Sequence, residues 1–249
     1  MRARIKEAQE AAAEFVGEVV DDVRDHAHVA ADSLREVARD LKPRLRGWLH
    51  VAMTPLALAG GIVLVVLSPT ALTRVGSAVF ASTALLLFAV SAIYHRGTWS
   101  PRVHGILKRL DHSNIFLLIA GSYTPFTLLL LEGRDRVTLL SVVWGGAILG
   151  VLFRVLWTNA PRWLYTPIYM ALGWAAIFYA PDFASGAVAV ITLVAVGGLL
   201  YTLGGVVYGL KRPNPFPRWF GFHEVFHAFT IAAFVCHYVA ASIATYSLR

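Results

Sequence analysis

Residues 222–246 read FHEVFHAFTIAAFVCHYVAASIATY. The stretch contains one acid, Glu224, and neither lysine nor arginine. About 20 mostly apolar residues are enough for a helix to cross the hydrocarbon core of a bilayer. The stretch therefore predicts a membrane-spanning helix, and two histidines, His223 and His227, lie near its beginning.

Six further stretches of the same kind precede this one, at residues 48–67, 75–95, 113–131, 137–157, 164–181 and 184–210. The fifth has the weakest pattern because it is short and contains Pro167, Gly173 and Trp174. Apolar residues make up 57% of the chain and charged residues 15%, whereas a soluble domain carries about 25% charged residues. The sequence therefore predicts an all-α fold, a bundle of seven transmembrane helices.

A long amphipathic helix is expected before the bundle, over residues 1–41, because its apolar residues recur at steps of three and four. This segment has a net charge of −4, in a chain whose total is +7. An acidic helix is a poor ligand for anionic lipid. Two interpretations stay open: the helix packs on its own membrane domain, or it pairs with another subunit in a homo-oligomer. We expect a cytoplasmic helix at 1–42 and a transmembrane domain at 43–249.

Lysine and arginine in the short loops set the orientation, because cytoplasmic loops are the more basic ones. With the N-terminus inside, twelve basic residues fall in cytoplasmic loops and four in outer segments. We therefore expect an integral membrane protein with a cytoplasmic N-terminus and an outer C-terminus. The basic charge belongs to these loops, so we expect membrane lipids and no nucleic acid as partners.

This orientation places several ionisable residues at one depth. His95 ends the second span, Asp111 precedes the third, and His223 and His227 begin the last, all at the inner face. Histidines four apart lie on one side of a helix and can share one ion. Three histidines with an open position for water form a catalytic type of zinc site. We therefore expect zinc on His95, His223 and His227, with Asp111 holding the water.

The remaining polar residues have weaker predicted roles. Ser91 lies one helical turn before His95 and either bonds a backbone carbonyl or orients Asp111, the water or the substrate. His50 and His112 share the depth of the site but are left out of the ligand set. His237 lies ten residues beyond His227, about 15 Å deeper at 1.5 Å per residue.

Four motifs in order resemble the hemolysin III family, the bacterial branch of the progestin and adipoQ receptors that includes the adiponectin receptors. They are Ser91-Ala-Ile-Tyr-His95, Leu110-Asp111-His112-Ser113-Asn114-Ile115-Phe116, Gly121-Ser-Tyr-Thr-Pro-Phe126 and His223-Glu-Val-Phe-His227. The resemblance covers about residues 43–246 and implies seven helices in a bacterial cytoplasmic membrane.

The resemblance also assigns roles. It implies zinc ligands at His95, His223 and His227, the water-linked aspartate at Asp111 and the motif serine at Ser91. A further family motif of glutamate, asparagine and histidine enters the first span. His50 fits its histidine, but Arg46 stands where the asparagine is expected, which puts the role of that motif in doubt.

Three functions are compatible with these features. The first is a zinc-dependent hydrolase of a membrane lipid amide or ester, with Asp111 as general base and Ser91 beside it. The family's likeness to alkaline ceramidases favours an amide. The second is a non-catalytic sensor or regulator of membrane state with structural zinc. The third, a pore, ranks last because the spans offer no continuous polar stripe.

Overall fold

The computed structural model describes residues 15–33, 43–179 and 188–247. The chain divides into two units, Met1–Arg44 and Leu45–Arg249. In the first unit, residues 15–33 are helical. The other parts of the helix predicted at 1–41 lie outside the described residues.

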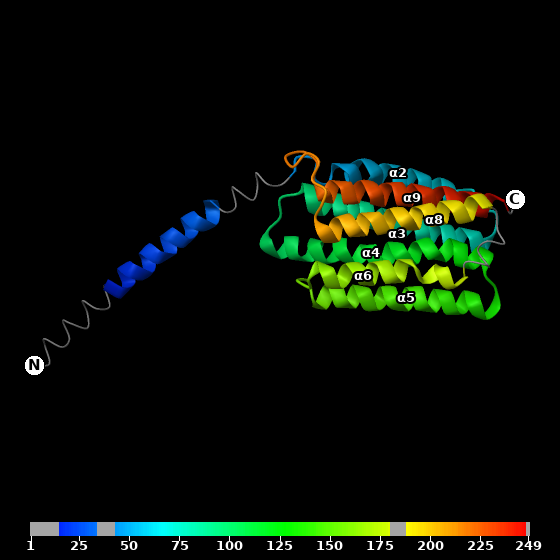
Figure 1. The fold of residues 1–249 in the computed structure, drawn as a ribbon, viewed down its shortest axis with the longest axis horizontal. Helices are drawn as coiled ribbons and strands as arrows, with labels where there is room; N and C mark the ends of the chain where they lie inside the picture. Colours follow the sequence, from blue (N-terminus) through cyan, green and yellow to red (C-terminus); the bar gives the residue numbers. More distant parts are fainter. Residues whose placement is uncertain (1–14, 34–42, 180–187, 248–249) are drawn as a thin grey trace, which may run out of the picture. The chain divides into compact units, whose positions relative to one another are not determined.

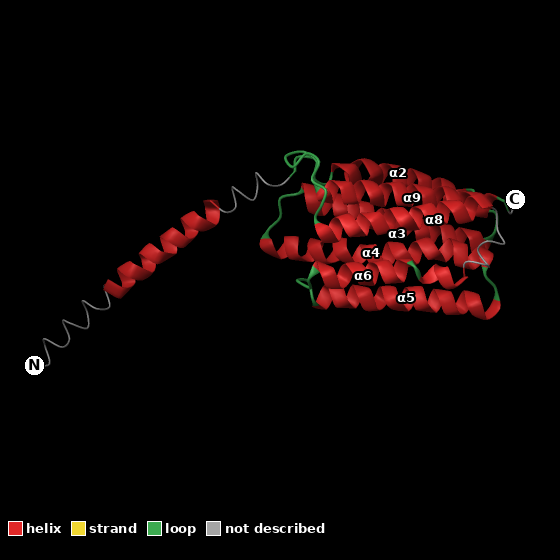
Figure 2. Cartoon of the chain, viewed as in Figure 1, coloured by secondary structure: helices red, strands yellow, loops and turns green. Residues whose placement is uncertain are grey.

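Among the described residues of the second unit, helices are joined by loops and no strand occurs (Figures 1 and 2). Six of the helices are long and apolar enough to cross a membrane, which makes the chain a multi-pass membrane protein. These six are α2 (Trp48–Val66), α3 (Ala71–Arg96), α4 (Pro101–Leu130), α5 (Gly133–Leu156), α8 (Val188–Leu210) and α9 (Phe222–Tyr246).

The predicted fifth span differs from the structure. It forms a 12-residue helix, α6 (Arg162–Gly173), followed by a short 3-10 helix, η1 (Ala175–Tyr179). The Tyr123 hydroxyl bridges the break, because it donates to the Gly173 carbonyl at 2.6 Å and accepts the Ala176 amide at 3.0 Å. A side chain thus satisfies backbone groups that a continuous helix would pair internally. Residues 180 and 181 of that predicted span lie outside the described residues.

Helix α4 is longer than the predicted third span. It begins at Pro101, whose position at the start of a helix requires no amide donor, and the Ser100 hydroxyl accepts the Val103 amide at 3.4 Å. Its 30 residues span about 45 Å. Asp111 therefore lies about one third of the way along α4 instead of just before a helix.

Helix α9 contacts α2, α3, α4 and α8, and α4 contacts α3, α5, α6 and α9. Glycines let α8 approach α9 closely: a Cβ atom at Gly197 would lie 2.4 Å from the His237 ring. Large side chains fill the spaces between α3 and α9, where the rings of Phe80 and Phe88 contact Phe234. This packing brings the beginning of α9 beside the end of α3.

Candidate metal centre

Three histidines from two helices meet at this junction. His95 lies in the last turn of α3, and His223 and His227 lie in the first two turns of α9. Each offers one ring nitrogen, and the three nitrogens lie within 4.8 Å of one another. His95 and His227 are buried, and His223 is half-buried. The structure therefore brings together the three predicted ligands.

The donor set fits a small divalent ion. The Nε2 atoms of His95 and His223 lie 3.1 Å apart. Two imidazole nitrogens at 2.0–2.1 Å from a tetrahedral zinc ion would be about 3.3 Å apart. The spacing of this pair suits zinc, although imidazole also suits copper, iron and nickel. The cluster can therefore bind a metal ion whose identity its donors leave open.

Asp111 lies beside this cluster. Its Oδ2 atom is 3.8 Å from Nε2 of His95, and its carboxylate accepts a hydrogen bond from the Ser91 hydroxyl. Ser91 is buried one turn before His95 on α3. Both predicted polar residues thus lie next to the histidines, with Ser91 in contact with Asp111.

His112 forms its hydrogen bonds with groups outside the histidine cluster. Its Nδ1–H donates to the Lys108 carbonyl at 2.7 Å, so its Nε2 is the acceptor for the Tyr208 hydroxyl at 3.3 Å. The Tyr208 oxygen also lies 2.9 Å from the hydroxyl of Tyr165. Both ring nitrogens of His112 therefore have hydrogen-bond partners.

His237 and His50 differ in their distance from the cluster. His237 lies well away on α9, where its Nε2 is 3.3 Å from the Val194 carbonyl oxygen. His50, also left out of the predicted ligand set, stacks on His227 with ring centroids 3.7 Å apart and planes 14° from parallel. His50 therefore touches a ligand without joining the cluster.

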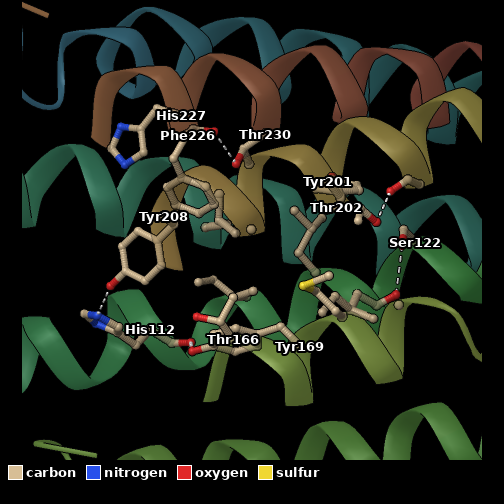
Figure 3. A pocket seen from close by; sticks show the side chains of 18 of the residues that line it. His112, Ser122, Thr166, Tyr169, Tyr201, Thr202, Tyr208, Phe226, His227 and Thr230 are labelled. Carbon is tan, nitrogen blue, oxygen red and sulfur yellow. Dashed lines mark hydrogen bonds between the residues drawn. The ribbon is translucent and has the colours of Figure 1, made fainter. Parts of the chain in front are cut away.

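A cavity of about 130 Å³ extends from the site along the bundle. In Figure 3, His227 lies at one end, whereas Tyr201, Thr202 and Ser122 lie at the other. A water molecule needs about 10–15 Å³ of such space. The cavity therefore has room for several waters or for part of an elongated ligand, and most of its wall is apolar.

Sequence reasoning did not predict that residues just before α2 contact the site. Arg46 forms an ion pair with Glu224, which is fully buried. Gly47 has a left-handed backbone with φ of 83°, and a Cβ atom there would lie 2.7 Å from the Cβ of His95. The available signal was Glu224 itself, a lone acid within an apolar span.

Comparison with known proteins adds a family. A family model described as Haemolysin-III related matches residues 39–238. The chain is 36% identical over 163 residues to the Hemolysin-3 homolog of Bacillus subtilis (strain 168), covering 64% of this chain and 73% of that protein. It is 32% identical over 163 residues to Hemolysin-3 of Bacillus cereus, covering 65% and 71%.

A more distant relative is the Adiponectin receptor protein of Drosophila melanogaster. It is 31% identical over 153 residues, covering 53% of this chain and 34% of the receptor. The family match takes in His95, Asp111, His223 and His227. The resemblance carried by the four motifs is thus confirmed, and the chain belongs to the Haemolysin-III related family.

Proposed function

We propose that the protein is a zinc-dependent hydrolase that cleaves an amide or ester bond of a membrane lipid. One observation carries the proposal: the carboxylate of Asp111 adjoins three metal-binding histidines at one end of a largely apolar cavity. A structural metal site needs no unliganded carboxylate and no cavity. Catalytic zinc sites keep an open position beside three protein ligands.

When bound, zinc polarises the substrate carbonyl and lowers the pKa of its water towards about 7. Asp111 takes a proton from the attacking water as the oxygen forms its bond to the carbonyl carbon. It then returns that proton to the leaving nitrogen or oxygen as the carbonyl–heteroatom bond breaks. The Ser91 hydroxyl holds the carboxylate in place during this transfer.

The cavity supports a lipid as the substrate. Side chains such as Leu87, Ile115 and Ile119 line it, as does Phe226. The lining also includes exposed residues at the end of α6, Gly173 and Trp174. An acyl chain that enters from the bilayer can lie along this wall while its carbonyl group approaches the histidines.

A lipid-release experiment tests the proposal. Purified protein in nanodiscs is incubated with amide- and ester-linked lipids, and the released fatty acid is measured by mass spectrometry. We expect release that stops with a chelator and resumes with zinc. Asp111→Asn should keep the metal but lower turnover by about 10²–10⁴-fold, the usual contribution of a general base. Equal turnover in Asp111→Asn and wild type would contradict this role for Asp111.

A sensor or regulator with structural zinc is the second candidate, because one ion on these histidines would tie α3 to α9. For that function, His227→Ala should destabilise the bundle, and none of the lipids should yield product. A pore stays last; ion flux through liposomes containing only this protein would favour it.

The course of the chain supports a seventh crossing through α6 and η1. The Thr158 hydroxyl accepts from Arg109 of α4, so α5 ends beside the first half of α4. Tyr208, near the end of α8, packs on His223, so α8 ends at the same side as α5. The chain therefore leaves α5 and enters α8 at opposite sides of the bundle. We infer seven crossings with the metal site at the cytoplasmic face.

Two roles are open for the N-terminal helix: packing on its own membrane domain, or pairing with another subunit. Phe15, Val19 and Val23 are exposed within the described helix at 15–33. We propose that this apolar side pairs with a second copy of the chain. Light scattering of the full chain in detergent should give an oligomer, and removal of residues 1–41 should give a monomer; an unchanged mass would contradict the pairing.

A further inference from the structure

We infer that a lead-in segment, residues 45–50, is a positioning element that holds both ligand-bearing helices of the metal site. It consists of the three residues before α2 and the first three residues of α2. The inference rests on the metal site proposed above. This lead-in segment supplies none of the three ligands, yet it contacts His95, His227 and the residue next to His223. These contacts arise from three adjacent features, each with a different chemistry.

The first contact is made by Gly47 and fixes His95. Gly47 has a left-handed backbone, and its Cα lies so close to His95 that a Cβ atom would be 2.7 Å from the Cβ of His95. The next residue, Trp48, receives the Arg96 guanidinium over its ring at 4.5 Å. The end of α3 is thus pressed against the lead-in segment at the ligand and at its neighbour.

The second contact is the ion pair between Arg46 and Glu224, which fixes the beginning of α9. Glu224 also accepts the Gly221 amide at 2.8 Å, and the Leu45 amide donates to the Trp219 carbonyl at 3.2 Å. A buried carboxylate is stable only when such partners surround it. His223 is the residue before Glu224, so its backbone is held by the same bonds.

The third contact is the ring stack between His50 and His227. His50 is 2% exposed and lies between His227 and Phe88, whose ring meets it edge-on at 5.2 Å. Neither ring nitrogen of His50 has a hydrogen-bond partner among the described residues. His50 therefore acts on His227 through its flat face.

The stack stands in for a bond that metal-binding histidines usually make. Such a histidine normally donates its second ring nitrogen to a carboxylate, a carbonyl or water, which fixes the ring orientation. Within the described part of the chain, Nδ1 of His227 is buried and has no partner. A parallel ring 3.7 Å away limits the rotation of His227 instead. The structure thus assigns His50 as a positioning residue that works by shape.

Ring and non-ring substitutions at His50 test this assignment. Zinc and cobalt(II) affinities are measured for His50→Phe, His50→Leu and His50→Gln in detergent, together with the visible spectrum of the cobalt form. We expect His50→Phe to stay near the wild-type affinity and spectrum. His50→Leu and His50→Gln should bind about 10–100-fold more weakly, the usual effect of losing a residue that orients a ligand, with an altered cobalt spectrum.

His237→Leu is the matched control, because His237 is a buried histidine of the same cavity that lies far from the ligands. It should leave metal affinity unchanged. Wild-type affinity in His50→Gln, which keeps polarity without a ring, would overturn the inference while leaving the metal site intact. Equal weakening in His50→Phe and His50→Leu would do so as well. Absence of metal binding by the wild type would overturn the metal site and this inference together.

Discussion

A single methyl group at Gly47 should disturb both backbone and site. Gly47→Ala places a side chain on a backbone with φ of 83° and 2.7 Å from the Cβ of His95. A non-glycine residue in this region costs about 1–3 kcal/mol. We expect lower thermal stability and weaker zinc binding, measured by a melting curve and by metal analysis of the purified protein.

Gly105→Ala is the control for this change. Gly105 lies in α4, and a Cβ atom there would have no neighbour within 4 Å. Alanine is favoured over glycine inside a helix by about 0.5–1 kcal/mol, so this variant should be slightly more stable and bind zinc normally. A normal zinc content in Gly47→Ala as well would show that His95 tolerates the displacement.

The three histidines of the candidate site could be predicted from sequence, each for its own reason. His223 and His227 follow from helical spacing, which is a local property. His95 required a count of the spans, because the number of crossings before each residue decides which membrane face it lies at. The stack of His50 on His227 could not be predicted, because it depends on how α2 rotates and packs against α9.

At the scale of elements, the Arg46–Glu224 pair should join the segment just before α2 to α9. Arg46→Met leaves a fully buried carboxylate without its cation. Breaking one side of a buried ion pair costs about 3–5 kcal/mol. The double variant Arg46→Met/Glu224→Gln removes the stranded charge and should recover much of this loss. A double-mutant cycle of unfolding free energies measures the coupling; additive effects would show that the two residues act independently.

The break after α6 shows which part of the fold escaped prediction. The apolar composition of residues 164–181 predicted one span, although Gly173 and Trp174 already weakened the pattern. The 3-10 turn depends on the Tyr123 hydroxyl, which reaches Gly173 and Ala176 from the last third of α4. Such a contact joins residues 50 positions apart in the chain. Local composition carries no information about it.

For the whole molecule, removal of the metal should lower the free energy of unfolding, and by more when the metal is bound more tightly. A ligand that binds only the folded state adds about 2.7 kcal/mol when its free concentration is 100 times its Kd. A chelator should therefore lower the melting temperature of the wild type. His223→Ala/His227→Ala should melt at one temperature with or without the chelator. A chelator effect of equal size in this variant would place the metal elsewhere.

Orientation can be tested by labelling single cysteines after Cys236→Ser removes the natural one. Asn159 lies just beyond the end of α5, beside Lys108 and at the same side of the bundle as the metal site. Arg134 lies at the beginning of α5, at the opposite side of the bundle. With the site facing the cytoplasm, Arg134→Cys should react with an impermeant thiol reagent on intact cells. Asn159→Cys should react only after permeabilisation, and the reverse pattern would invert the topology.

The length of α4 has a consequence for how water, metal and lipid would reach the site. From Asp111 to its end at Leu130 the helix covers about 30 Å, the thickness of the hydrocarbon core, and its first ten residues add about 15 Å beyond that. If Leu130 lies at one surface of the hydrocarbon core, the Asp111 carboxylate lies at the other, where hydrocarbon meets water. In a lipid hydrolase built this way, water and metal arrive from the aqueous phase, and the acyl chain arrives from the hydrocarbon core of the bilayer. The two reactants need not share a route, and neither has to cross the other's medium.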